Sequence, residues 1–292
     1  MKSDACRDYP HTDLACESGR ACLASEEASY AVGGVPVTVT RRHEEDGGHS
    51  VTVSMGRITA RGEGELASLA EVLSREMRKL TEVMLGRPPA PDLRVLVVGL
   101  GNADMTPDAI GPGTLRRLTV TRHLKAYNAA LFEALGCCEL AAIAPGVMGQ
   151  TGMESGETVK AAVELTRPHL LVAVDALAAR SCDRLSSTVQ LSDGGISPGA
   201  GIGNHRMGIN RDTMGCPVMG VGVPTVVDSA TLVRDALEEA GVDMDTLPPA
   251  MEKVLESGRQ FIVSPRDCDE MVELTCRLLA LSLDLAFGVG KL

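Results

Sequence analysis

Two short runs of uninterrupted apolar residues constrain the fold of this chain more than any other feature. Residues 95–98 and 170–174 contain only Val, Leu and Ala, which is the pattern of parallel strands buried on both faces of a sheet. Asp175 directly follows the second run, and Asp108 follows the first after a glycine-containing turn. Open α/β sheets bind ligands beyond the carboxyl ends of such strands, where a carboxylate is costly unless it is paired or used. Asp108 and Asp175 are therefore the first candidates for a functional site.

Strand and helix patterns alternate along most of the chain. Strands are predicted over 94–100, 140–144, 170–175, 187–192 and 216–223, and helices over 66–85, 111–118, 125–135, 153–166, 228–240 and 268–287. From residue 94 onward this alternation predicts an α/β fold with a mainly parallel, twisted sheet and helices on both faces. Alternating valines at 35–39 and 51–55 add an N-terminal β-hairpin. The polar residues 1–33 are interpreted as an irregular leader in front of a single domain, residues 34–292.

Composition argues against several classes of protein. The net charge of −11 is unfavourable for a broad nucleic-acid-binding surface. No run of about 18 apolar residues is present, so no membrane segment is expected. The nine cysteines form no Cys-x-x-Cys pair and no signal-peptide core precedes them, which indicates reduced thiols in a soluble, cytoplasmic protein. Cysteines and histidines show no zinc-type spacing, so no metal or other cofactor is expected.

The turn after the first apolar run has two interpretations. Gly99 and Gly101 resemble the start of a dinucleotide-binding fingerprint, but Asp104 stands where the third glycine belongs. No acidic residue closes a second strand at the distance that ribose binding needs. A tight glycine turn explains the pattern better, and a non-enzymatic nucleotide-binding α/β domain is the alternative.

Other residues near the strand ends are candidates for supporting or substrate-binding roles. They are His123, Arg180, Asp193, Gly199 and Gly201. Arg180 either forms a structural ion pair with the preceding strand-end aspartate or assists it. Asp193 opens a glycine-rich loop that contains Gly199 and Gly201, and this loop either lets a peptide backbone approach closely or is an ordinary surface loop. His123 is a candidate for orienting a group near the sheet, although a surface role is the simpler interpretation.

Several longer segments occur in the order found in one known family. They are Val-Val-Gly-Leu-Gly-Asn at 97–102, Thr-Pro-Asp-Ala-Ile-Gly-Pro at 106–112, Thr-Arg-His-Leu at 121–124, Ala-Pro-Gly-Val-Met-Gly at 144–149, Val-Asp-Ala-Leu-Ala-Ala-Arg-Ser at 174–181, Gly-Ala-Gly-Ile-Gly-Asn at 199–204 and Gly-Val-Pro-Thr-Val-Val-Asp at 222–228. With these segments the chain resembles the germination protease (spore protease) family of endospore-forming bacteria. The likeness is dense over residues 94–230 and thin elsewhere.

The resemblance implies an endopeptidase of atypical aspartic type, with Asp108 and Asp175 as its two essential aspartates. Its implied substrates are the small acid-soluble proteins of the spore core, degraded during germination, and its implied fold is similar to that of the hydrogenase maturation peptidases. Family members are zymogens that remove their own leader, here at Asp13–Leu14, and they assemble as homotetramers. Because the maturation peptidases bind metal at a similar sheet edge, a metal-dependent peptidase using the same acids is the alternative.

Overall fold

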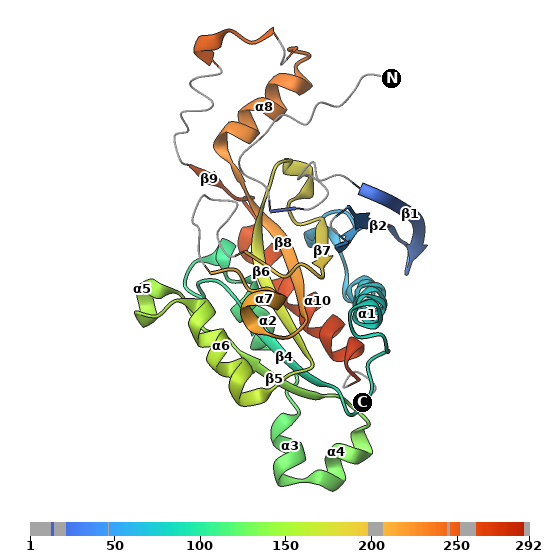
Figure 1. Ribbon diagram of the computed structural model, residues 1–292. Coiled ribbons are helices and arrows are strands. Elements are labelled where there is room, and N and C mark those ends of the chain that lie inside the picture. Colours follow the sequence, from blue (N-terminus) through green and yellow to red (C-terminus); the bar gives the residue numbers. More distant parts are fainter. Residues whose placement is uncertain are drawn as a thin grey trace.

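One large β-sheet lies at the centre of the structure (Figure 1). The computed structural model describes residues 13–14, 22–45, 47–197, 207–243, 246–251 and 261–288. Within these ranges nine strands pair in the order β1-β2-β3-β7-β8-β6-β4-β5, and β9 pairs with β8. The strands are β1 Cys22–Val32, β2 Val35–Glu44, β3 His49–Ser54, β4 Arg94–Gly99, β5 Glu139–Ile143, β6 Leu170–Ala179, β7 Thr188–Ser192, β8 Val218–Asp228 and β9 Ile262–Val263.

The sheet has a parallel half and an antiparallel half. Strands β8, β6, β4 and β5 run parallel to one another. Strands β1, β2, β3 and β7 are joined in antiparallel pairs, and both β7 and β9 pair with β8 in antiparallel register. The expectation of a mainly parallel sheet is therefore correct only for the half that carries the two apolar runs, and the sheet as a whole is mixed. Parallel neighbours need crossover helices, and the helix-and-strand alternation that supplies them begins only at β4. Likeness to the hydrogenase maturation peptidases stays a prediction.

The expected N-terminal hairpin is present, and a second hairpin precedes it. β2 and β3 pair in antiparallel register, as the alternating valines predict. β1 pairs with β2 around Gly33 and Gly34, whose φ angles of 57° and 85° suit a two-residue hairpin turn. The expectation of an irregular segment over residues 1–33 is therefore wrong for β1. The Gly-Gly pair between two half-polar strands is the sequence signal for this turn.

Helices cover both faces of the sheet (Figure 1). The helices are α1 Glu63–Leu85, α2 Ile110–Leu115, α3 Arg122–Tyr127, α4 Ala129–Leu135, α5 Met148–Thr151, α6 Ser155–Thr166, α7 Arg211–Met214, α8 Ser229–Glu239 and α10 Cys268–Ala286. Successive side chains of β4 point to opposite faces of the sheet, so they pack against different helix layers. Val95 and Val97 join the core under α1, α2 and α10, whereas Leu96 and Val98 join the core under α6 and α7. The prediction of helices on both faces is confirmed.

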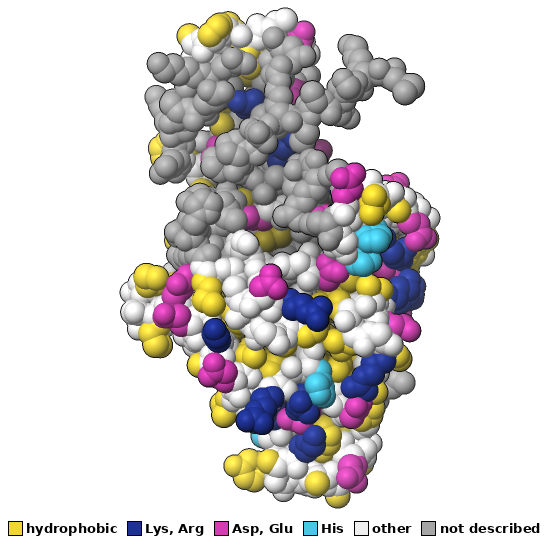
Figure 2. Space-filling model, in the orientation of Figure 1, with side chains coloured by type: hydrophobic (Ala, Val, Ile, Leu, Met, Phe, Trp, Pro, Cys, Tyr) yellow, Lys and Arg dark blue, Asp and Glu magenta, His cyan; other side chains and the backbone are white. Residues whose placement is uncertain are grey.

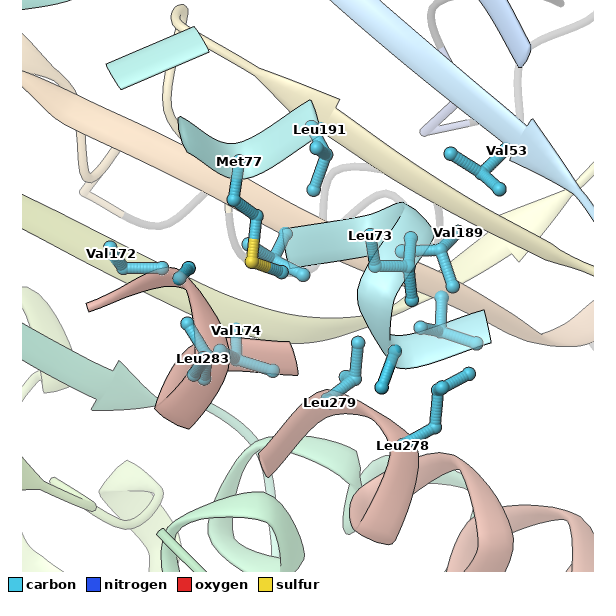
Figure 3. Close-up of a cluster of buried hydrophobic side chains, with 14 of the residues drawn as sticks. Val53, Leu73, Met77, Val172, Val174, Val189, Leu191, Leu278, Leu279 and Leu283 are labelled. Carbon is cyan, nitrogen blue, oxygen red and sulfur yellow. The ribbon is translucent and has the colours of Figure 1, made fainter. Parts of the chain in front are cut away.

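The larger core lies between the sheet and the helices α1 and α10 (Figure 3). Leu73 and Met77 of α1 pack with Leu279 of α10 against strand residues such as Val174 and Leu191. All five side chains are at most 1% exposed. Aliphatic and sulfur side chains fill this core, as the aromatic content of 2% requires.

One buried acid interrupts the apolar face of α1. Glu76 is 1% exposed, and Arg41 of β2 donates hydrogen bonds to both of its carboxylate oxygens at 2.7 and 2.8 Å. Lys79 donates a further hydrogen bond at 3.1 Å. Burial favours a higher pKa for Glu76, but the hydrogen bonds from Arg41 and Lys79 outweigh burial and the pKa is lowered. Glu76 therefore anchors α1 to β2 as an ionised group.

The helix expected over 125–135 is two helices, α3 and α4. Asn128 separates them with φ of −151° and ψ of 72°, outside the helical range. Its side-chain Oδ1 accepts a hydrogen bond from the N–H of Leu131 at 3.1 Å and so caps α4. Asparagine competes with helical backbone bonds in this way, which is why it favours caps over helix interiors.

Figure 2 shows Lys and Arg side chains interspersed with Asp, Glu and hydrophobic side chains over the lower half of one face. The net charge of −11 thus coexists with a mixed surface on that part of the molecule. Among the residues that the structure describes, no helix combines the length and the apolar character that crossing a bilayer requires.

Candidate active site

Asp175 lies inside the central strand β6 rather than beyond its end. It stands opposite Gly222 of β8, and β6 continues because β8 pairs with it as far as Val227. The strand expected to end at residue 175 is therefore longer, and the aspartate is only 6% exposed. The backbone N–H of Ala176 donates a hydrogen bond to Asp175 Oδ1 at 2.9 Å. The carboxyl group is thus buried in the sheet and oriented by its own strand.

Asp108 reaches the same region from the 3-10 turn η2, Thr106–Asp108. The backbone N–H of Asn102 donates a hydrogen bond to Asp108 Oδ2 at 2.7 Å. Gly101 has a φ of 107°, and a Cβ there would lie 2.0 Å from the Asp108 carbonyl oxygen and 2.9 Å from Oδ1. The turn after β4 therefore holds Asp108 by close backbone approach, which only glycine permits at this position.

Both aspartates line one cavity at the carboxyl ends of β4, β6 and β8. Its volume is about 370 Å³, within the range of ligand pockets. The described lining residues are Asp13, Leu100, Gly101, Met105, Pro107, Asp108, Val147, Ser155, Asp175, Ala176, Leu177, Ala178, Thr225, Val226, Ile262 and Ser264. The walls are mostly apolar, so charges inside the cavity interact more strongly than they would in water. The cavity lies at the sheet edge that the strand pattern predicts.

Residues Asp13 and Leu14 of the expected leader lie against β6 beside this cavity. The N–H of Asp13 donates to the carbonyl of Ala178 at 3.1 Å, and the N–H of Ala178 donates to Asp13 Oδ2 at 3.0 Å. Leu14 is fully buried in a small apolar cluster with Leu177 and Val227. The two residues expected to flank the leader cleavage bond therefore lie at the candidate site.

Further apolar groups pack around the cluster that contains Leu14. Ala179, Cys182, Leu185 and Val263 pack with it. Burial first, and a hydrogen bond with Asp235 second, together raise the pKa of the Cys182 thiol to about 11. At neutral pH this thiol is therefore uncharged and acts as part of the apolar wall.

Most of the predicted supporting residues lie away from the cavity. Asp193 bonds to His49, through Oδ2 to Nδ1 at 2.9 Å and through Oδ1 to the backbone N–H at 2.8 Å. His123 lies on α3 in a separate surface pocket with Arg122 and Tyr127. Arg180 directly follows β6 and is not among the described lining residues of the cavity. The predicted positions 199 and 201 lie outside the described residues.

Sequence reasoning missed Thr225, which lines the cavity from β8. The segment 222–228 is recognisable in the sequence, but the strand that leads into it is expected to end at residue 223. Asp228 caps the helix α8 that follows, because its Oδ1 accepts a hydrogen bond from the N–H of Ala230 at 2.7 Å. The strand, however, continues to Asp228 and carries Thr225 into the site.

The glycines after β4 serve close packing between backbones. A Cβ on Gly99 would lie 2.5 Å from the carbonyl carbon of Gly111 in α2, and a Cβ on Gly111 would lie 2.2 Å from the carbonyl oxygen of Leu100. These contacts seat α2 directly on the end of β4. They give the Gly-x-Gly pattern a structural role that needs no nucleotide.

The described part of the chain brings no three His, Cys, Asp or Glu side chains together as a metal-binding group. Asp108 and Asp175 are the acidic residues from the body of the domain that line the cavity, and Asp13 of the leader joins them there. Carboxylate oxygens are suitable ligands for hard cations, so the metal-dependent alternative is a question for experiment.

Comparison with known proteins relates the chain to germination proteases. The family profile described as germination protease matches residues 26–240. A germination protease of Clostridium perfringens (strain 13 / Type A) is 37% identical over 261 residues, which cover 82% of this chain and 78% of that protein. One from Clostridium tetani is 30% identical over 289 residues, covering 89% and 87%. One from Halalkalibacterium halodurans is 49% identical over 148 residues, covering 50% and 39%.

Proposed function

The chain belongs to the germination protease family, and from that premise we propose that it is an aspartic-type endopeptidase in which Asp108 and Asp175 hydrolyse peptide bonds. One observation carries the proposal: both aspartates line a cavity together with Asp13, a residue of a peptide segment that is hydrogen-bonded to β6. A site in which Asp13 of the same chain already pairs with a strand beside two carboxyl groups is suited to peptide substrates.

In the proposed reaction one carboxyl group of the pair is ionised and the other is protonated, because two neighbouring carboxylates do not both ionise easily. The ionised group takes a proton from a water molecule, whose oxygen attacks the carbonyl carbon of the substrate. The protonated group gives its proton to the leaving amine as the C–N bond breaks, so one water molecule is consumed. The backbone hydrogen bonds to Asp108 and Asp175 orient the two groups for these transfers.

We further propose that the chain is a self-processing zymogen whose leader is cut between Asp13 and Leu14. The support is the pairing of Asp13 with Ala178 and the burial of Leu14 beside the cavity. Cleavage at this bond would release residues 1–13 and would leave β1 in the sheet. The leader region 1–33 would then be a docked segment and an edge strand in front of one peptidase domain, residues 34–292.

The proposed substrates are small acid-soluble spore proteins, degraded in the spore core during germination. The name shared by the relatives supports a role in germination. A net charge of −11 is compatible with substrates that carry basic segments. A homotetramer is proposed from the family resemblance and is measurable by light scattering of the purified chain.

The decisive experiment is incubation with a purified small acid-soluble spore protein, followed by intact-mass mapping of the products. Asp108→Asn and Asp175→Asn should each fold and should each lower cleavage by about 10³-fold or more. Asp193→Asn is the matched control, because that aspartate bonds to His49 outside the cavity. Parent-like cleavage by either folded catalytic variant would refute the carboxyl pair.

The same assay tests the metal-dependent alternative. Undiminished cleavage in excess chelator, with no metal in the purified protein by elemental analysis, is the expected result. Loss of cleavage in chelator that is restored by one divalent cation would favour the metal-dependent peptidase instead.

A further inference from the structure

Strand β8 contains one residue more than its partner β6 at the cavity. Leu177 stands opposite Pro224, and the next residue, Ala178, stands opposite Val226. Thr225 is therefore the extra residue of a β-bulge, with no partner of its own in β6. Bulges of this kind bend a strand and redirect a side chain, and they are common beside active sites.

The bulge reverses the side-chain alternation of β8, so the residues after Thr225 point to the opposite face of the sheet from the one expected for an unbroken strand. Val223 belongs to the large core under α1 and α10, whereas Val227 packs with Leu14 and Leu177. In an unbroken strand these two valines, four positions apart, would lie on the same face. One inserted residue therefore lets β8 complete the Leu14 cluster and presents Thr225 to the cavity.

The hydroxyl of Thr225 has no hydrogen-bond partner. Thr225 is 1% exposed, and its Oγ1 is one of four buried side-chain polar atoms without a partner in the part of the chain that the structure describes. Of these four, it alone lines the cavity of Asp108 and Asp175. Leaving a buried hydroxyl unpaired costs about 1–3 kcal/mol, so a native protein that retains one generally has a use for it.

We propose that Thr225 Oγ1 donates a hydrogen bond to the carbonyl oxygen of the peptide bond that is cleaved. This inference rests on the proposed peptidase function. In the proposed reaction the ionised carboxylate only accepts hydrogen bonds and the protonated carboxyl gives its proton to the leaving amine, so the carbonyl oxygen that gains charge when water attacks needs a separate donor. Thr225 supplies such a donor from the rigid sheet, without a charge of its own. The bond strengthens as the carbonyl oxygen becomes an oxyanion.

The test compares Thr225→Val, which keeps the shape and removes the hydroxyl, with Thr225→Ser, which keeps the hydroxyl. Cleavage of a peptide spanning one mapped cut site is measured as kcat and KM, and unfolding is followed by calorimetry. Thr225→Val should lower kcat about 10- to 100-fold with KM within about threefold, because the bond is strongest in the transition state. Its unfolding midpoint should stay equal or rise, because an unpaired buried hydroxyl is gone. Thr225→Ser should retain most of kcat.

Thr158→Val is the matched control. Thr158 Oγ1 is also buried without a partner, but Thr158 lies on α6 and is not among the described lining residues of the cavity. The same change there should leave kcat unaltered. If Thr225→Val does not fold, the comparison of Thr225→Ser with Thr225→Ala carries the test in the same way.

Three results would overturn the inference. Parent-like kcat in Thr225→Val shows that the hydroxyl is unused, or satisfied by a bound water only. Equal loss in Thr225→Ser and Thr225→Val shows that shape matters and the hydroxyl does not. Failure of the peptidase function itself is recognised separately, because then the parent does not cleave the peptide or Asp175→Asn cleaves it as well as the parent does.

Discussion

Replacing Leu14 by alanine tests whether the buried side chain of this residue holds the expected leader at the site. Leu14 is 0% exposed and packs with Leu177, Ala179 and Val227. Burying a leucine side chain contributes about 1.5–3 kcal/mol, and alanine retains only a small part of this. Taking about 2 kcal/mol for the loss, the ratio of docked to undocked leader should fall about 30-fold, since 1.4 kcal/mol corresponds to tenfold.

The assay is hydrogen exchange at the backbone amide of Ala178, which donates to Asp13 Oδ2 at 3.0 Å. The measurement is made in an Asp108→Asn background, so that the proposed self-cleavage does not remove the leader. If the Ala178 amide exchanges only while Asp13 and Leu14 are detached from β6, its exchange rate follows the undocked fraction. Leu14→Ala should then speed exchange of this amide by about the same 30-fold. Amides of the core strand β4, which pairs with β5 and β6, should exchange as before.

Leu23→Ala is the matched control, because Leu23 is a leucine of the same N-terminal segment that is 63% exposed. It should leave the exchange of Ala178 unchanged. Equal exchange of Ala178 in the Leu14→Ala protein and its parent would refute the reasoning, since it would mean that the hydrogen bonds of Asp13 hold the leader without help from the apolar cluster.

Two further substitutions test how the fold supports the site. Glu76→Gln should destabilise the protein by about 2 kcal/mol at pH 7, because the change removes a buried charge from the bonds donated by Arg41. The pKa of Glu76 is lowered in the folded state, so this stabilisation is present above the unfolded pKa of about 4.3 and is lost as pH falls through the folded value. Denaturant unfolding from pH 3 to 7 should therefore show the variant and parent converging at acid pH. Gly101→Ala should lower peptide cleavage at least about 100-fold, because its Cβ would strike the Asp108 backbone and displace the carboxyl group.

Each of these changes has a control that isolates its cause. Glu63→Gln removes the acid of an exposed ion pair with Arg277, and such pairs add little to stability, so an equal loss there would contradict the role of burial. Gly86→Ala also places alanine at a positive φ, 68° compared with 107° at Gly101, but with nothing within 4 Å of the new Cβ. It should cost some stability and no activity, and a comparable loss of activity would show that backbone strain, not contact with Asp108, explains the effect.

The sequence is sufficient to predict the parallel half of the sheet, because its strands are buried on both faces and therefore uninterrupted in apolar character. It also predicts that Asp108 and Asp175 lie at one edge, and both line the cavity there, although β6 runs past Asp175 to Ala179. The antiparallel half is harder to predict. Strand β1 is mostly exposed, so no apolar pattern marks it, and only the Gly-Gly turn indicates that it pairs with β2.

The remaining features of the site depend on contacts between distant segments. Leu14 is a single leucine in a polar stretch, and its burial follows from a cluster built by β6, β8 and β9. Thr225 reaches the cavity because β8 gains a residue against β6, and register shifts leave no periodic signal in a short strand. Asp193 is the converse case, since this acid at a strand end bonds to His49 of the neighbouring strand.

Strand β6 sets the positions of three of the groups assigned to the site, whereas the turn after β4 holds Asp108. It carries Asp175, it provides the backbone of Ala178 to the leader, and its pairing with β8 creates the bulge at Thr225. A slip of one residue along this strand would turn Asp175 to the opposite face of the sheet, because side chains alternate. The buried apolar residues on both faces of β6, divided between the two cores, oppose such a slip. The apolar run that precedes Asp175 therefore does more than build the core: it fixes the register on which the carboxyl pair, the docked leader and the unpaired hydroxyl all depend.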